Sequence, residues 1–218
     1  MNYNHCCGAD RLFDLKGAQK EMKKFRKKGT DKSTNLLLNK LAENGIANKT
    51  LLDIGGGIGA IQWFFLRHGA AKTMDVDAST AYLRVAEDYA IENGWREKCN
   101  FESGDFSLLE KKIEDYDYVT LNKVVCCYPD YRSLLQSAIK SCKDQLALTF
   151  PIRNILSRML VFLSGLYFRF KKNPFRTYNH SPREIELFIR SNGFEPVFKS
   201  IRFPWHVQIY MRVGKDKF

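Results

Sequence analysis

The sequence lacks the features that mark a secreted or membrane-spanning chain. Residues 1–14 contain no apolar run behind a basic patch, so they do not resemble a secretory signal. The longest apolar stretch, residues 155–170, is interrupted by Arg158 and is shorter than the roughly 20 residues that a membrane-crossing helix needs. We therefore expect a soluble, cytoplasmic protein.

The chain also lacks the cysteine spacing of a zinc site. Its six cysteines include no C-x-x-C pair. The adjacent pairs Cys6-Cys7 and Cys126-Cys127 could in principle meet on a metal, but reduced thiols that pack as small apolar side chains are the interpretation we favour. We therefore expect no metal site.

Acidic residues are too few at the two ends of the chain to balance the basic ones. The net charge of +11 divides into +6 for residues 1–40, −4 for residues 41–150 and +9 for residues 151–218. Such a distribution attracts an anionic partner to surfaces built from the two ends. The apolar fraction of 44% is ordinary for a globular protein, so a packed core is expected.

The order of predicted elements indicates an α/β fold. Helices are expected over residues 10–28 and from Asp31 or Ser33 to about Glu43. Strands and helices then alternate, with strands over residues 50–54, 72–76, 99–102, 117–121 and 145–150 and helices over residues 60–68, 79–92 and 131–142. A helix that begins at Ser181 and two strands, residues 197–203 and 207–213, follow. We predict a doubly wound, mostly parallel seven-stranded sheet with an antiparallel C-terminal hairpin.

A length of 218 residues fits one domain, residues 1–218. Two segments of this domain lie outside the alternation of strands and helices. They are an N-terminal helical cap, residues 1–46, and a lid insertion, residues 152–180. The insertion is rich in apolar side chains, and its basic residues include Arg153, Arg169 and Lys171. Three interpretations are open: a hydrophobic lid over a small molecule, a helix on a membrane surface through residues 153–172, or an apolar cap on the core.

A glycine-rich turn, Gly55 to Gly59, follows the strand at residues 50–54 and opens a helix. It also satisfies the G-x-G-x-x-A fingerprint of dinucleotide folds, but glycines here indicate only that a ligand approaches the backbone closely. Asp53 argues against a dinucleotide, because its carboxylate would repel a pyrophosphate by roughly several kcal/mol. S-adenosylmethionine (SAM) instead brings an ammonium and a sulfonium, which an acid attracts. Alternatively, Asp53 only ties down the loop backbone.

Further polar side chains follow the next strands. Asp77 can accept bonds from both ribose hydroxyls, and Asp75 is the less favoured ligand. Asp105 can accept a bond from the adenine amino group beside an apolar wall of Phe106, or it caps the next helix. Asn122 could meet the amino-acid end of the ligand. The predicted cofactor-binding residues are Asp53, Gly55, Gly56, Gly57, Asp77, Ala78, Gly104, Asp105, Phe106 and Asn122.

Three of these segments resemble the successive motifs of class I SAM-dependent methyltransferases: residues 53–59, 76–79 and 104–106. The resemblance covers residues 50–150 by motif and residues 181–213 by topology. It implies SAM as cofactor and in-line transfer of its methyl group from sulfur. The stretch VVCCYPD, residues 124–130, and Leu12-Phe13-Asp14 also resemble a bacterial subgroup, which favours Asp where this chain has Asn122.

The substrate is expected to be a small, partly apolar or anionic molecule. Tyr128 is the first candidate for contacting it, and His180 is the second, as a possible base. His5 and His206 are weaker candidates, and Cys127 could line the same pocket. An RNA methyltransferase that uses the basic terminal segments is the alternative, and a SAM-binding protein without catalysis is a third hypothesis.

Overall fold

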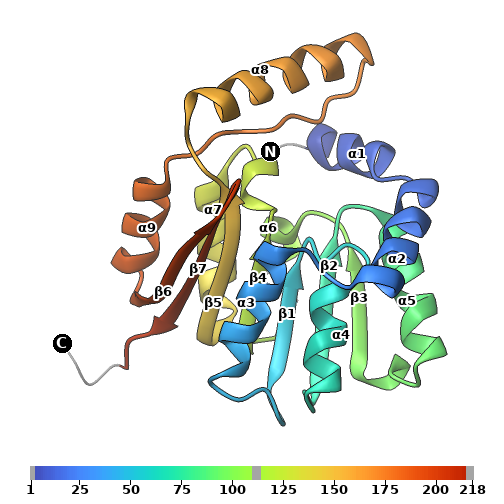
Figure 1. Cartoon of the computed structure of the whole chain (residues 1–218), viewed down its shortest axis with the longest axis vertical. Coiled ribbons are helices and arrows are strands. Elements are labelled where there is room, and N and C mark those ends of the chain that lie inside the picture. Colours follow the sequence, from blue (N-terminus) through green and yellow to red (C-terminus); the bar gives the residue numbers. More distant parts are fainter. Residues whose placement is uncertain (1–2, 110–113, 215–218) are drawn as a thin grey trace.

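The computed structural model describes residues 3–109 and 114–214, in which one seven-stranded sheet has helices on both faces (Figure 1). The sheet order is β3-β2-β1-β4-β5-β7-β6, and β7 runs antiparallel to both of its neighbours while β1 to β5 are parallel. The predicted doubly wound sheet with its C-terminal hairpin is therefore confirmed. The strands are β1 (Thr50–Ile54), β2 (Lys72–Asp77), β3 (Cys99–Ser103), β4 (Tyr116–Asn122), β5 (Cys142–Pro151), β6 (Phe194–Arg202) and β7 (Trp205–Arg212).

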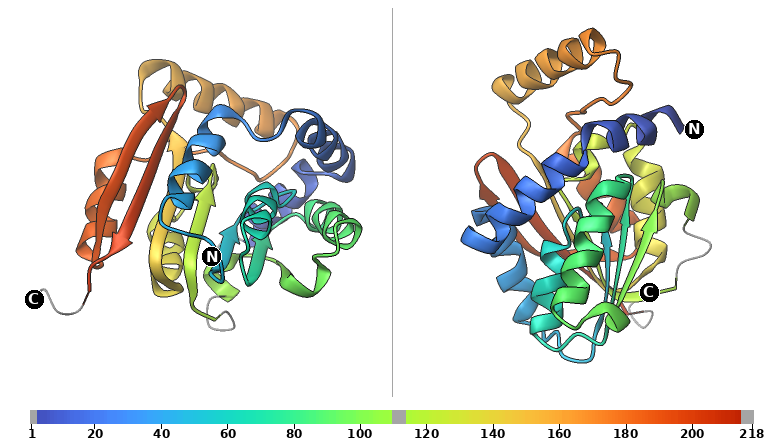
Figure 2. Two further views of the ribbon diagram at one scale, coloured as in Figure 1. Left: turned by 60° about the horizontal axis from the view of Figure 1, so that its bottom comes forward. Right: turned by 90° about the vertical axis from the view of Figure 1, so that its right-hand side faces the viewer.

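The helices form two layers, one on each face of the sheet, and a third group beyond the carboxyl ends of the parallel strands, at the top of Figure 1 (Figures 1 and 2). One face carries α3 (Lys32–Ala42), α4 (Ala60–Arg67) and α5 (Thr80–Glu92). The other carries α6 (Phe106–Leu109), α7 (Tyr131–Lys140) and α9 (Pro182–Ser191). Helix α2 (Leu15–Lys28) packs on α5 through Ala18 and Met22, and the third group is α1 (Tyr3–Leu12) and α8 (Ile155–Phe170).

Alternate residues of the central strands pack into two separate cores, one on each face of the sheet, because successive side chains of a strand point to opposite faces. Leu52 and Ile54 of β1 pack with α7 and α9, whereas Leu51 packs with α3 and α4. All three side chains are buried. Burial on both faces explains why β1 lacks a polar–apolar alternation: its last four residues, Leu51 to Ile54, are all buried.

The N-terminal region differs from its prediction, because residues 10–28 do not form one helix. The chain breaks between α1 and α2, where Asp14 adopts an extended conformation and its side chain accepts a hydrogen bond from the Gly17 amide at 2.8 Å. The Phe13 carbonyl accepts a bond from the Ser79 hydroxyl at 2.6 Å, which ties the break to the start of α5. The helix prediction was wrong here because a cap and a tertiary contact override a continuous helical pattern.

Two other boundaries are set by the sheet and by capping. The helix predicted to reach Cys142 ends at Lys140, since Cys142 already pairs with Tyr116 in β5. As expected, Asp31 is the N-cap of α3, where its carboxylate accepts bonds from the amides of Ser33 and Thr34.

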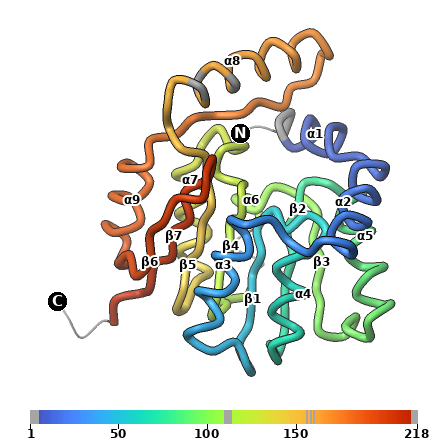
Figure 3. The backbone as a smooth tube through the Cα atoms, viewed as in Figure 1, coloured from blue at the N-terminus to red at the C-terminus, as the bar shows by residue number. Residues whose placement is uncertain are grey.

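The insertion at residues 152–180 consists of α8 and an extended return. The helix begins with a capping box, in which Asn154 and Ser157 bond reciprocally. The path of the chain in Figure 3 carries α8 beyond the same sheet edge as α1. Among the described residues, none of the helices combines the length and the apolar character needed to cross a bilayer.

Phe65 tests the packing between α4 and the sheet, because its ring is fully buried and lies 5.2 Å, edge to face, from that of Tyr118. Phe65→Ala should lower the free energy of unfolding by about 3–5 kcal/mol, through lost apolar burial and a residual cavity. Urea denaturation measures this change. Ile91→Ala, at an exposed position of α5, is the control and should change stability by less than about 0.5 kcal/mol; an equal effect of both substitutions would contradict the assigned core.

Candidate active site

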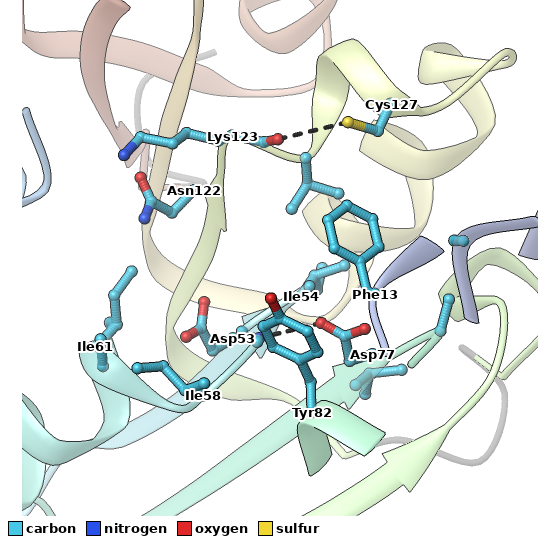
Figure 4. Close-up of a pocket in the computed structure, with 18 of the residues that line it drawn as sticks. Phe13, Asp53, Ile54, Ile58, Ile61, Asp77, Tyr82, Asn122, Lys123 and Cys127 are labelled. Carbon is cyan, nitrogen blue, oxygen red and sulfur yellow. Dashed lines mark hydrogen bonds between the residues drawn. The ribbon is translucent and has the colours of Figure 1, made fainter. Parts of the chain in front are cut away.

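A cavity of about 410 Å³ lies at the carboxyl ends of the parallel strands. Its lining includes all ten residues predicted to bind a cofactor: Asp53, Gly55, Gly56, Gly57, Asp77, Ala78, Gly104, Asp105, Phe106 and Asn122. Figure 4 shows Asp53 and Asp77 along one side of this cavity, with Asn122 and Lys123 along another. Residues from four consecutive parallel strands thus meet in one crevice, as open α/β sheets require.

The glycine loop rests directly on a group of carboxyl groups. The Gly56 amide donates to Asp75 Oδ1 at 3.1 Å, and the Gly57 amide donates to Asp77 Oδ2 at 3.0 Å. A Cβ on Gly56 would lie 2.7 Å from both Asp75 oxygens and 2.8 Å from Asp53 Oδ2, so any side chain there would collide with these carboxyl groups. Gly55 and Gly57 have φ of +67° and +62°, which favours glycine at both positions.

Three carboxyl groups share this buried region, and burial makes their charged forms unfavourable. Burial raises the pKa of the Asp53 carboxyl to about 7; the bond from the Thr120 hydroxyl opposes the rise and the Asp77 charge adds to it. Burial and the charges of Asp53 and Asp77 raise the pKa of Asp75, and burial also raises the pKa of Asp77. The site is therefore an acidic cradle in which a bound cation would stabilise the ionised carboxylates.

Asp53 has an unused acceptor within this cradle. Its Oδ1 accepts the Thr120 hydroxyl at 2.6 Å, whereas its Oδ2 is buried and has no hydrogen-bond partner among the described residues. A buried carboxylate oxygen without a partner costs free energy, about 1–3 kcal/mol. Within the described residues this side chain bonds Thr120 of β4 and not the loop backbone, which Asp75 and Asp77 hold instead, so the expected alternative of tying down the loop is not seen for Asp53.

Asp105 and Phe106 form a second subsite at the end of β3. Asp105 Oδ1 accepts bonds from the Ser107 amide at 3.0 Å and the Ser107 hydroxyl at 2.8 Å, so the capping role expected as an alternative is present. The Tyr128 hydroxyl also donates to Asp105. Burial and this bond raise the pKa of Tyr128, which keeps the phenol protonated. Tyr128 lines the cavity but is held as a hydrogen-bond donor to Asp105.

Asn122 and Lys123 lie where β4 ends. The Asn122 carbonyl oxygen accepts the Thr149 hydroxyl at 2.6 Å, and its amide donates to the Thr34 hydroxyl at 3.2 Å. Lys123 has φ of +66°, a left-handed conformation that costs a non-glycine residue about 1–2 kcal/mol. Its ammonium donates to Asp31 Oδ2 at 2.5 Å and lies 5.2 Å from the centre of the Trp205 ring. β4 therefore places a cation beside the acidic cradle.

Several lining residues were absent from the predicted set because their role depends on tertiary structure. Phe13 packs edge to face with Tyr82 and with Phe175, at 5.8 Å between ring centres in each pair. These rings come from the α1–α2 junction, from α5 and from the return after α8, and all three line the cavity. The Leu12-Phe13-Asp14 resemblance to a subgroup is the sequence signal that could have identified Phe13.

The structure does not bring every candidate to the cavity. His180 does not line it; its Nε2 instead lies 2.9 Å from the Tyr128 carbonyl oxygen, and burial lowers the pKa of its imidazole. His206 lies in β7 against Phe150, also outside the lining. The side chain of His5 falls outside the described part of the chain. Cys127 does line the cavity, with its sulfur 3.7 Å from that of Cys126.

Comparisons with known proteins bear on this site. Residues 51–145 match the family model described as a methyltransferase domain. This match covers β1 to the start of β5, the part of the chain that carries the glycine loop and the strand-end acids. The chain is therefore similar to methyltransferase domains over this region, which supports the predicted reaction class.

Curated relatives and solved structures are similar over different lengths. Over 97 residues, 43% of the chain, it is 31% identical to a ribosomal protein L11 methyltransferase from Deinococcus radiodurans. Over 67% of the chain, it is 28% identical to a ubiquinone biosynthesis O-methyltransferase from Haemophilus ducreyi. The matches span only 36% and 61% of these relatives' own lengths. A magnesium protoporphyrin IX methyltransferase from Synechocystis with bound SAH (S-adenosylhomocysteine) shares the fold, with a TM-score of 0.72 at 17% identity over 94% of this chain and 98% of that one.

The raised pKa of Asp53 predicts an unusual pH dependence of stability. Because this pKa lies above the ordinary 3.8, ionisation of Asp53 destabilises the folded chain as pH rises from about 4 through about 7. Asp53→Asn removes that ionisation and should stabilise the ligand-free protein at pH 8 by on the order of 1–3 kcal/mol, with little difference near pH 4. Denaturant titrations at both pH values measure this, and a stability difference independent of pH would show that the Asp53 charge is not the cause.

Proposed function

We propose that this chain is a SAM-dependent methyltransferase, with residues 1–218 acting as one domain, that methylates a small anionic and partly apolar molecule. The observation that carries the proposal is the acidic cradle under the glycine loop. A phosphate-bearing dinucleotide would meet repulsion there, whereas the ammonium and sulfonium of SAM would be attracted. The matched domain model supports the reaction class. Nothing in the described part of the chain favours RNA as the substrate.

The residues present fit this cofactor. The partnerless Asp53 Oδ2 supplies an acceptor for a cationic group, and Gly56 leaves the space that a side chain would fill. Asp77 would hold the ribose hydroxyls through oxygens that already accept the Gly57 and Ser79 amides. When bound, SAM supplies an electrophilic methyl group. The chain's own task is to hold the acceptor in line with that group.

The adenine end would lie between Asp105 and Phe106. Ala78 and Gly104 complete this part of the lining, and Leu109 lies 3.2 Å from the place of a Cβ on Gly104. The bond from Tyr128 fixes the Asp105 carboxylate. We propose that Tyr128 is a positioning residue for the cofactor subsite and not an acid or base of the reaction.

The proposed acceptor site is a groove of about 780 Å³ that adjoins the cavity. Four residues line both spaces: Glu21, Lys24, Asp31 and Lys123. The groove itself carries more basic than acidic side chains, together with two aromatic rings: Lys20, Lys24, Lys32, Lys123 and Arg202, Glu21 and Asp31, and Phe203 and Trp205. This composition favours a planar anion, because cations neutralise its charge and the rings cover its apolar faces.

An anionic acceptor is also consistent with the side chains at the site, because His180, Tyr128 and Asp31 are each poorly suited to act as a general base. His180 lies outside the cavity, and the Tyr128 phenol is held protonated. Although burial would raise the pKa of Asp31, hydrogen bonds from Lys123, Ser33 and Thr34 lower it, which makes this carboxylate a weak base. An ionised oxygen attacks without losing a proton, so such an acceptor needs no general base.

Asp77→Asn tests the cofactor site. The substitution removes the ribose acceptor charge and should weaken SAH binding by about 10- to 100-fold in calorimetry. Asp88→Asn, at an exposed position of α5, is the matched control and should bind SAH as the wild type does. Undetectable SAH and SAM binding by the folded wild type would overturn the proposed function; unchanged binding by Asp77→Asn would overturn only the role given to Asp77.

Lys123→Gln tests the acceptor groove. With SAH present, we expect 3-hydroxy-2-naphthoate to bind the wild type more tightly than neutral 2-naphthol, and the substitution to remove this preference by weakening naphthoate binding about three- to tenfold. Lys98→Gln, at the opposite end of the sheet, is the control. Fluorescence titration measures both probes. If naphthoate and naphthol bind equally, the groove does not select anions, whatever the SAH affinity.

A further inference from the structure

Helix α8 faces the body of the protein with its more polar side. Ser164 Oγ lies 2.7 Å from the Thr177 hydroxyl oxygen, and Ser157 Oγ accepts a bond from the Asn179 amide at 2.8 Å. At its C-terminal end, Phe168 packs on Ala9 and Phe175, and is the buried apolar side chain that anchors the helix. A helix of a globular protein ordinarily turns its apolar side inward. Among the described side chains of α8, most of the large apolar ones are instead exposed.

The opposite side of α8 carries an exposed apolar stripe. Its members recur at intervals of three and four residues, which places them on one face of a helix: Ile155, Met159, Phe162, Leu163, Leu166 and Phe170. Ile155, Phe162 and Phe170 are 86%, 65% and 83% exposed. The side chains of Leu156, Arg158 and Leu160 fall outside the described part of the chain. Leaving such a contiguous stripe in water is unfavourable, which indicates an interaction surface.

The charge around the stripe has one sign. Residues 145–183 contain seven Lys or Arg and no Asp or Glu. Arg153 is exposed just before α8, and Arg169, Lys171 and Lys172 are exposed at its C-terminal end. An apolar stripe between basic ends is the pattern of a helix that lies in the interface of an anionic bilayer, with cations on lipid phosphates and apolar side chains among the acyl chains.

We propose that α8 docks this protein on an anionic membrane surface. The helix lies beyond the strand ends at which the cavity opens (Figure 1), so docking would bring the candidate site to the bilayer. A second copy of the chain fits the stripe less well, because two chains of charge +11 would bring like charges together. The inference rests on α8 alone and does not depend on the proposed reaction.

Sedimentation with vesicles tests the proposal on the full chain. We expect the wild type to bind vesicles of phosphatidylcholine with 30% phosphatidylglycerol more than about tenfold better than vesicles of phosphatidylcholine alone. The double variant Phe162→Ser, Phe170→Ser keeps the charge and should lose about tenfold or more in binding, because two rings no longer enter the bilayer. The double variant Ile91→Ser, Leu187→Ser removes exposed apolar side chains of α5 and α9, and should bind as the wild type does.

Circular dichroism and SAH calorimetry verify that each variant is folded, independently of lipid binding. Three results would overturn the proposal: no binding of the wild type to anionic vesicles, equal loss in both double variants, or binding that survives the α8 substitutions. A dimer in analytical ultracentrifugation that the α8 variant alone dissociates, without vesicle binding, would assign the stripe to a second copy instead.

Discussion

The structure of this site depends on one unfavourable arrangement, the burial of Asp53, Asp75 and Asp77 beneath a glycine loop. Burial raises the pKa of all three carboxyl groups, the charge of Asp77 adds to the rise at Asp53 and at Asp75, and one Asp53 oxygen has no partner among the described residues. The backbone amides of Gly56 and Gly57 offset part of that cost. A side chain on Gly56 would collide with the carboxyl oxygens, and the positive φ of Gly57 favours glycine there. The position of the carboxyl groups therefore requires glycine in the loop that covers them.

This constraint links stability to function. A core built only for stability would replace such acids by apolar or amide groups, since an uncompensated buried charge destabilises the folded state. Their presence together at the ends of β1 and β2 is accounted for when a cationic ligand completes the site. The roles differ within the group: Asp75, bonded to Gly56 and Gln62, holds the loop, whereas Asp53 has an acceptor oxygen that no described residue uses.

The parts of the fold that local chemistry determines could be predicted from the sequence. The strand at Thr50–Ile54, its glycine turn and the strand-end acids follow from buried apolar runs and from residues with special backbone freedom. The contribution of Phe175 could not be predicted, because it reaches the cavity through tertiary contacts, and Phe13 was indicated by the Leu12-Phe13-Asp14 resemblance alone. The break between α1 and α2 was missed for the same reason, and the sequence left open which face of α8 would be buried.

Charge then orders the surfaces around the site. The interior at β1 and β2 is acidic, the groove beside Lys123 is basic, and the exposed ends of α8 are basic and apolar. Charge separates the cationic cofactor from the two proposed anionic partners, whereas the shape of the groove and the apolar stripe of α8 would distinguish the acceptor from the membrane. The acidic middle and the basic ends of the chain are separate in sequence but meet at the carboxyl ends of the parallel strands. The net charge of +11 is therefore a sum over an acidic interior and basic surfaces.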